Sequence, residues 1–264
     1  MKREKFGSRI GFILVSAGCA IGIGNVWKFP YLAGEMGGAA FILIYLLFLL
    51  IMGIPVLVCE FAIGRASRYS IAEAFETLEP EGTKWHWTKW IGILGSYLLM
   101  MFYTTVAGWM LYYCFRNIRG DFAGAGTKEV EAGFSQMLGN APVMGLWTFI
   151  LITAGFGICW FGIQNGIEKV SKVMMSVLFL IMIVLAVRSV FLEGAGEGVR
   201  FYLIPDFQKM QEIGIGNVIF GAMSQAFFTL SIGIGAMMIF GSYLGKERSL
   251  TGEALSITIL DTFV

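Results

Sequence analysis

Long apolar runs recur along this chain, and they constrain its fold more than any other feature. Six runs are long enough, at about 1.5 Å per residue, to cross about 30 Å of hydrocarbon as helices. Their approximate extents are 10–34, 41–64, 90–115, 143–163, 170–192 and 214–243, and a shorter run begins near 252. The sequence therefore predicts an all-α integral membrane protein.

Composition supports this class and argues against several functions. Hydrophobic residues make up 57% of the chain and charged residues only 14%, far from the usual balance of a soluble domain. The formal net charge of +1 and the lack of basic stretches interleaved with aromatic residues argue against a nucleic-acid partner. The sequence gives no indication of an enzyme: it has no metal-ligand cluster, no intramembrane Ser–His pair and no carboxylate pair at helical spacing.

The four cysteines do not have the spacing of a metal or redox site. They lie in or beside apolar runs, so we expect small buried hydrophobic side chains at Cys19, Cys59, Cys114 and Cys159.

The distribution of basic residues predicts the orientation in the membrane. The first residues, "MKREKFGSR", are basic, and the apolar run after them is long and lacks a small-residue cleavage motif. We expect a retained tail, because placing the N-terminus inside puts most Lys and Arg residues on the cytoplasmic side. The prediction is a multi-pass protein of the cytoplasmic (plasma) membrane with a cytoplasmic N-terminus.

The last apolar run is too short to cross the bilayer. It reaches Val264 after about 13 residues, which cover roughly 20 Å of a hydrocarbon core about 30 Å thick. A terminus at that depth would leave carbonyl groups unsatisfied in lipid. We therefore expect this chain to be part of something longer, whose missing helices matter.

Two of the runs are interrupted by glycine in the same way. Gly22-Ile23-Gly24 lies inside the first run, and Gly233-Ile234-Gly235 lies inside the sixth. A matched pair of interrupted spans, one per five-helix repeat, is typical of inverted-repeat transporters with a site at the membrane midplane. At each break, free N–H groups attract an anion and free carbonyls coordinate a hard cation such as sodium. The alternative is that the glycines form a close-packing surface for neighbouring helices.

The residues around both breaks resemble a known family. "SAGCAIGIGNVWKFPYLAGEMGGAAFILIY" and "FFTLSIGIGA" are similar to the first and sixth helices of the neurotransmitter:sodium symporter family, as are "GIPVLVCEFAIGR" and "NGIEKVSKVMM" to its second and fifth. The resemblance covers the whole chain. It implies sodium-coupled symport of an amino acid by alternating access, in an inverted-repeat (five-plus-five) fold whose first and sixth helices are unwound at mid-membrane.

The resemblance also implies how the chain is organised. Family members have about eleven or twelve helices, so this chain corresponds to about six and a half of them. The expected parts are a cytoplasmic tail over 1–9, a first repeat over 10–213 with helices one to five, and the start of a second repeat over 214–264.

Site residues follow from the resemblance position by position. Sodium is expected at Gly18, Ala20, Ile21, Asn25, Thr229 and Asp261. The amino acid is expected at Ala20, Ile23, Gly24, Leu99, Tyr103, Phe228, Thr229, Ser231 and Ile234. The expected gating residues are Arg3, Phe6, Lys28, Gln225 and Phe228. Glu60 is expected to support the site by accepting hydrogen bonds from the free amides of the sixth helix.

Three departures from the family pattern refine these expectations. Gly22 stands where monoamine carriers have an aspartate, so the substrate should bring its own carboxylate, and Phe228 and Ile234 favour a hydrophobic amino acid. Asp261 stands where the family usually has asparagine, and its added negative charge predicts that chloride is not required. Lys28 replaces an arginine and cannot form a bidentate fork, which predicts a weaker outer gate.

The resemblance leaves a second hypothesis open. Several expected ligands of the second sodium site belong to an eighth helix that this sequence does not contain. The chain could therefore be a truncated, transport-incompetent fragment that acts as a partial or regulatory subunit. The expected partners are the amino acid, sodium and the lipid bilayer, with the missing C-terminal helices or a homo-oligomer as further candidates.

Overall fold

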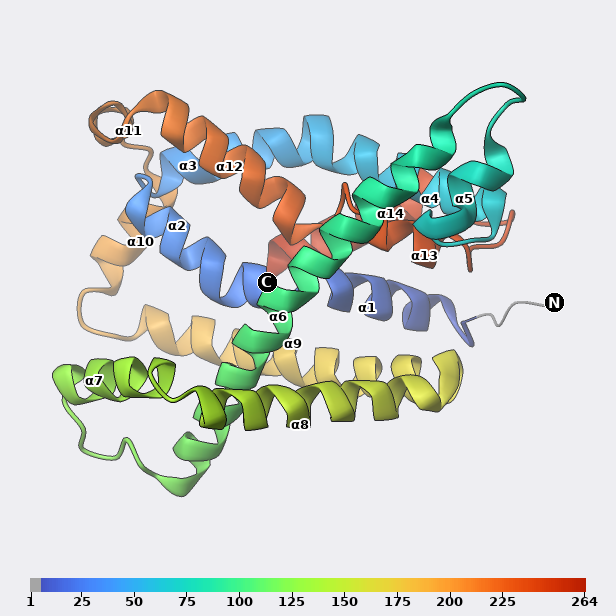
Figure 1. Cartoon of the computed structure of the whole chain (residues 1–264). Coiled ribbons are helices and arrows are strands. Elements are labelled where there is room, and N and C mark those ends of the chain that lie inside the picture. The colour runs from blue at the N-terminus through green and yellow to red at the C-terminus, as the bar shows by residue number, and fades with distance from the viewer. Residues whose placement is uncertain (1–5) are drawn as a thin grey trace. The chain divides into compact units, whose positions relative to one another are not determined.

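A computed structural model describes residues 6–264, and every regular element in that range is helical (Figure 1). Arg3, predicted as a gating residue, lies outside the described residues. The contacts divide the chain into two compact units. The first comprises residues up to Ile93 together with Ile163–Val264, and the second comprises Leu94–Gly162.

Four helices in the described range are long and apolar enough to cross a membrane. Two of them are α6 (Thr88–Arg119) and α8 (Ala141–Trp160). A third joins α3 (Ala39–Phe48), the π-helical turn η2 (Leu49–Gly53) and α4 (Ile54–Ser67). The fourth joins η4 (Ile163–Glu168), also π-helical, and α9 (Lys169–Val190). These helices confirm the second to fifth predicted runs.

The first predicted run is a broken span. α1 (Arg9–Ala20) ends before the glycine pair, and the chain resumes as the π-helical turn η1 (Gly24–Lys28) and α2 (Phe29–Glu35). The two parts are bent by 49° relative to each other.

The sixth predicted run is broken as well. α12 (Ile215–Thr229) and α13 (Ala236–Gly241) are separated by residues whose backbone cannot continue a right-handed helix. Ser231, Gly233 and Gly235 have φ values of +52°, +90° and +76°. Glycine adopts positive φ without steric cost, which explains its presence at this break. Both predicted interruptions are therefore confirmed.

Shorter helices connect these spans. They are α5 (Ile71–Leu78), the 3₁₀ turn η3 (Trp85–Trp87), α7 (Thr127–Leu138), α10 (Ala195–Leu203) and α11 (Phe207–Ile213). The seventh apolar run forms α14 (Leu250–Phe263), whose N-cap Ser249 accepts a hydrogen bond from the amide of Gly252.

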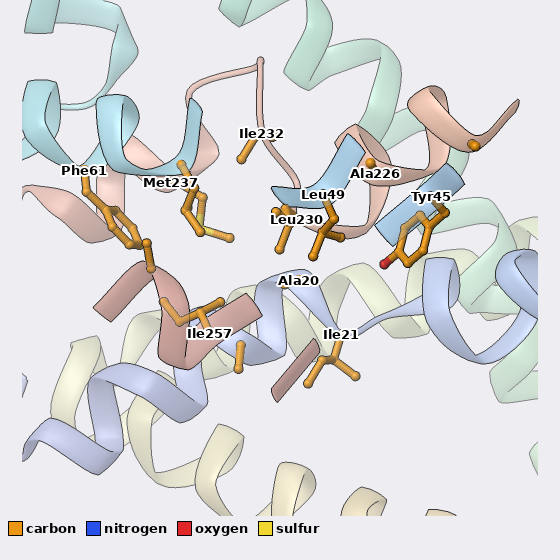
Figure 2. Close-up of a cluster of buried hydrophobic side chains, with 14 of the residues drawn as sticks. Ala20, Ile21, Tyr45, Leu49, Phe61, Ala226, Leu230, Ile232, Met237 and Ile257 are labelled. Carbon is orange, nitrogen blue, oxygen red and sulfur yellow. The ribbon is translucent and has the colours of Figure 1, made fainter. Parts of the chain in front are cut away.

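The core of the first unit lies where the broken helices meet α3, α4 and α14 (Figure 2). Leu49, Leu230 and Ile257 are almost completely buried there. α4 and α13 approach backbone to backbone: a Cβ on Gly241 would lie 2.7 Å from the Cα of Phe61, and one on Gly64 would overlap the carbonyl of Met238. Small residues permit such close packing of helices in membranes.

The second unit is built around aromatic side chains of α6. Trp109 packs edge to face against Phe134, and the Tyr113 ring stacks on Phe122. A Cβ on Gly108 would lie 2.7 Å from the hydroxyl of Thr148, so α6 and α8 are in close contact.

The prediction of buried cysteines is wrong for three of the four. Cys59, Cys114 and Cys159 are exposed, Cys19 is partly buried, and all four thiols are free. Lipid tails are as apolar as a protein core, so hydropathy alone does not direct such side chains inward in a membrane protein.

Candidate functional site

Three polar side chains from separate helices converge beside the break in the first span. Asn25 belongs to η1, Thr229 is the last residue of α12, and Asp261 lies on α14. Asn25 is 9% exposed, and Thr229 and Asp261 are each 1% exposed. The sequence separates Asn25 and Asp261 by 236 positions, so their meeting is a product of the tertiary fold.

Hydrogen bonds connect all three side chains. Asn25 Nδ2 donates to Asp261 Oδ1 at 2.8 Å and to the Asp261 carbonyl at 3.2 Å. The hydroxyl of Thr229 lies 3.1 Å from Asn25 Oδ1 and 3.0 Å from Asp261 Oδ2. One carboxylate, one amide oxygen and one hydroxyl oxygen are thus gathered at a buried site.

The carboxylate in this cluster has no basic partner in the described part of the chain. None of the ion pairs found between residues 6 and 264 includes Asp261. A buried charge is costly unless an opposite charge compensates it. The side chains around it offer oxygen ligands, which hard cations prefer. The chemistry of the cluster therefore suits a monovalent hard cation.

The two broken helices are held together by side-chain contacts to free backbone carbonyls. Ser231 donates its hydroxyl proton to the carbonyl of Cys19 at 3.0 Å. Gln225 Nε2 donates to the carbonyl of Gly24 at 3.1 Å. Gly18, Ala20 and Ile21, predicted for sodium, lie at the end of α1 beside these contacts.

The helix that resumes after the break begins at Gly24, with Ile23 as its N-cap residue. The first amides of a helix have no intrahelical acceptor, so they can bind an anion. Gly24 packs against Phe228, since a Cβ at this position would lie 2.9 Å from the ring. Lys28, one turn further on, places its Nζ 4.0 Å from the centroid of the same ring.

Glu60 on α4 caps the broken sixth span. Its side chain is buried, and its two carboxylate oxygens accept from the amides of Gly233 at 2.6 Å and Met237 at 3.1 Å. These amides lie in the break and in the first turn of α13, where the helix itself supplies no acceptor.

A cavity of about 470 Å³ reaches the polar cluster. It is lined by Asn25, Thr229 and Asp261 together with apolar residues including Phe29, Pro30 and Ile42. Among the described residues predicted for the substrate, Thr229 alone lines it. Ile234 lies in the break of the sixth span. Leu99 and Tyr103 lie on α6 in the second unit, and their part in a substrate pocket stays a prediction.

Phe6, which is predicted to take part in gating, contacts two aromatic rings. Phe6 packs edge to face against Phe12 at 5.5 Å and against Tyr243 at 5.7 Å between ring centroids.

Sequence reasoning missed two buried carboxylates and one cavity residue. Glu168 is 3% exposed and Glu253 is 2% exposed, although both are charged residues near the ends of apolar runs. Tyr45, inside an apolar run, lines the cavity beside Asp261. A charged residue flanking a span is normally read as an interface anchor, so only its burial reveals a different role.

The comparisons with known proteins agree with this architecture. A family model described as "Sodium:neurotransmitter symporter family" matches residues 3–130 and 128–264. A sodium-dependent transporter of Bacillus subtilis (strain 168), YhdH, is 39% identical over 264 residues, which are 100% of this chain and 57% of that protein. A sodium- and chloride-dependent taurine transporter of Homo sapiens is 29% identical over 92% of this chain and 44% of its own length.

One solved structure matches closely. The crystal structure of MhsT in complex with L-phenylalanine superposes with a TM-score of 0.89 at 39% identity, covering 98% of this chain and 58% of that chain. The chain therefore spans less than two thirds of the length of each of these proteins.

Proposed function

This chain belongs to the sodium:neurotransmitter symporter family, and we propose that it serves sodium-coupled symport of a hydrophobic amino acid by alternating access. The family consists of sodium-dependent membrane transporters, not enzymes, and the apolar helices described above fit a multi-pass membrane protein.

The observation that carries the proposal is the buried cluster of Asn25, Thr229 and Asp261. Its oxygens lie 2.8–3.2 Å from their hydrogen-bond partners. They belong to three separate helices, η1, α12 and α14. A sodium ion among these oxygens would neutralise Asp261 and hold η1, α12 and α14 together. Ion binding would then favour one arrangement of the broken helices, which is the differential interaction that coupling requires.

Two features support an amino acid as the substrate. Gly22 offers no carboxylate to a substrate amine, while the opening amides at Ile23 and Gly24 suit a substrate carboxylate. Phe228 and Ile234 provide apolar surface for the side chain. MhsT was crystallised in complex with L-phenylalanine, a hydrophobic amino acid, which is consistent with this choice.

We propose that transport does not require chloride. Asp261 places a carboxyl group beside the expected sodium ion, within the hydrogen-bonded cluster, and its charge would balance the ion as chloride does in other members. The human taurine transporter is named as chloride-dependent, so the two proteins are expected to differ in this respect.

We also propose that the protein lies in the cytoplasmic membrane with its N-terminus inside. The excess of Lys and Arg on the loops expected inside supports this orientation.

The test is binding of radiolabelled amino acids to the purified chain in sodium and in potassium buffers. Asn25→Ala should abolish sodium-dependent binding because it removes one cluster ligand and one donor to Asp261. Asn217→Ala is the matched control, since Asn217 is exposed and its side-chain amide donates to the nearby carbonyl of Ile213, the last residue of α11. Saturable binding that is equal in sodium and potassium buffers, or that is unchanged in Asn25→Ala, would contradict the proposal.

A further inference from the structure

The segment that leads into α1 is bound by a buried carboxylate from another span. Glu168 ends the π-helical turn η4, immediately before α9, and is 3% exposed. One of its oxygens accepts from the amide of Gly7 at 2.8 Å, and the other accepts from the hydroxyl of Ser8 at 3.4 Å and from Lys172 Nζ at 2.7 Å.

The surface of α1 is shaped to receive this carboxylate. Gly11 lies in the first turn of α1 and faces Glu168 so closely that a Cβ at this position would overlap the carboxyl group. Gly11 has an ordinary helical backbone, so its conformation does not require a glycine. A glycine is required because the Glu168 carboxyl group occupies the space that a side chain would need.

The energetic consequence concerns the movement of α1. Among residues 6–264, two of the three donors to Glu168 belong to residues 7 and 8, just before the helix begins. If this segment moved away, the buried carboxylate would lose both donors and, of the described donors, would keep Lys172. Hydrogen bonds to a charged group are stronger than neutral ones, and leaving such a group without its donors is costly.

We propose that Glu168 is a positioning residue for transport, which fastens the N-terminal end of α1 to α9 and sets how readily that end is released. This inference rests on the proposed function, because alternating access moves one part of the fold against another around the site, and α1 is one half of the broken first span. Glu168 contacts neither the expected sodium nor the expected substrate, so it acts through the position of α1. The π-helical turn that carries it offers a point of adjustment, since such turns are frequent at functional sites.

The test measures the position of α1 directly and needs neither transport nor ligand. Ser16 on α1 is completely buried, and its hydroxyl has no partner among the described residues, so Ser16→Cys is a mild substitution. In the full chain with its four native cysteines replaced by alanine, the rate at which a hydrophilic maleimide labels this cysteine reports the opening of α1. We expect Glu168→Gln to raise that rate by roughly tenfold, because the loss of charge weakens every hydrogen bond to the group.

A control separates this effect from a general loss of carboxylates. Glu76→Gln removes the charge of a residue whose ion pair with Lys89 is exposed, and it should leave the labelling rate unchanged. Equal labelling in Glu168→Gln and the unaltered background would overturn the proposal. So would an increase of the same size in Glu76→Gln.

A second pair of variants tests the contact with Gly11 by steric means. Gly11→Ala should increase labelling as Glu168→Gln does, because its methyl group displaces the carboxylate. In a Glu168→Ala background, which has room for that methyl group, Gly11→Ala should produce no further increase. Additive effects would contradict the proposed contact. Thermal unfolding of each variant identifies any that fail to fold. If Gly11→Ala alone does not fold, the double variant Gly11→Ala with Glu168→Ala still tests the contact, because it has room for the methyl group.

The design distinguishes failure of this inference from failure of the proposed function. Labelling is measured without sodium or amino acid, so it reports the role of Glu168 even if the chain binds neither. If sodium-dependent binding is found while Glu168→Gln leaves labelling unchanged, the function stands and this inference fails.

Discussion

Lys28 lies over the ring of Phe228, with its Nζ 4.0 Å from the ring centroid. The contact joins the resumed half of the first span to the last turn of α12, next to the two breaks. A cation above an aromatic face contributes about 0.5–2 kcal/mol, depending on its desolvation. Lys28 cannot make a two-pronged hydrogen bond as arginine does, but it retains this ring contact.

Phe228→Leu should therefore speed the release of a bound amino acid. The substitution keeps an apolar side chain but removes the ring that faces Lys28, so we expect dissociation to become about 2–30-fold faster. The measurement is the off-rate of a radiolabelled amino acid in sodium buffer. Phe220→Leu, at an exposed position of the same helix, is the control. An unchanged off-rate would show that this pair does not retain the substrate.

Asp261→Asn should lower the apparent affinity for sodium. The variant keeps the shape of the side chain but removes the negative charge that we expect to balance the ion. Sodium titrations of amino-acid binding should shift to higher concentration in gluconate buffer and recover in chloride buffer. Asp121→Asn, in the loop after α6 where it pairs with Arg116, is the matched control. Full sodium affinity of Asp261→Asn without chloride would refute the assigned role of this charge.

Glu60→Gln should destabilise the protein without touching the sodium ligands. The carboxylate accepts from amides of Gly233 and Met237, whereas glutamine can accept with only one of its two terminal atoms. One buried amide is left without an acceptor, at a cost of about 1–3 kcal/mol. Thermal unfolding in detergent should show a Tm lower by several degrees than that of Glu76→Gln. A Tm equal to that of the unaltered protein would contradict this role, because it would mean that both amides still find acceptors in the variant.

Gly64→Ala should prevent close contact of α4 and α13. The added methyl group would overlap the Met238 carbonyl, which belongs to a helix backbone and cannot turn away as a side chain can. Gly155→Ala on α8 is the matched control, because nothing lies within 4 Å of a Cβ there and alanine favours a helix. We expect size-exclusion chromatography to show aggregated Gly64→Ala and monodisperse Gly155→Ala. A monodisperse Gly64→Ala with unchanged Tm would argue against this packing.

The loop between α5 and α6 should loosen in acid. The amide of His86 donates to Glu79 Oε2 at 3.0 Å, and its ring Nδ1 lies 2.8 Å from Glu79 Oε1. Desolvation alone would raise the pKa of Glu79, but the hydrogen bonds and charge of His86 hold that pKa below its usual value. Because the folded-state pKa is lowered, the stabilisation is present above the unfolded pKa and is lost as pH falls through the folded pKa.

Hydrogen exchange of the peptide covering residues 79–90 measures this change, after correction for the intrinsic effect of pH. Protection of the His86 amide should fall in a step as Glu79 is protonated. Glu79→Gln should show no such step, and a step that persists in this variant would assign the titration to another group.

The sequence alone determined where the spans lie and where two of them break. Hydropathy is a local property, and a run of about 20 apolar residues has few alternatives in lipid. Gly233 and Gly235 mark the second break because glycine adopts positive φ without steric cost, and Gly22 and Gly24 lie at the first break. The resemblance to a family added the names of Asn25, Thr229 and Asp261, each on its own helix.

The tertiary structure alone decided which of those positions meet. Asn25 and Asp261 lie 236 residues apart, and Gly7 and Glu168 lie 161 residues apart, yet both pairs are within 2.8 Å. No local pattern specifies such contacts, since they depend on how helices pack, and the exposed Cys59 shows that apolar character does not decide burial in a membrane protein. Glu168 reads as an ordinary charged residue beside a span until the packed helices surround it, because burial of a polar side chain is a property of the assembled fold.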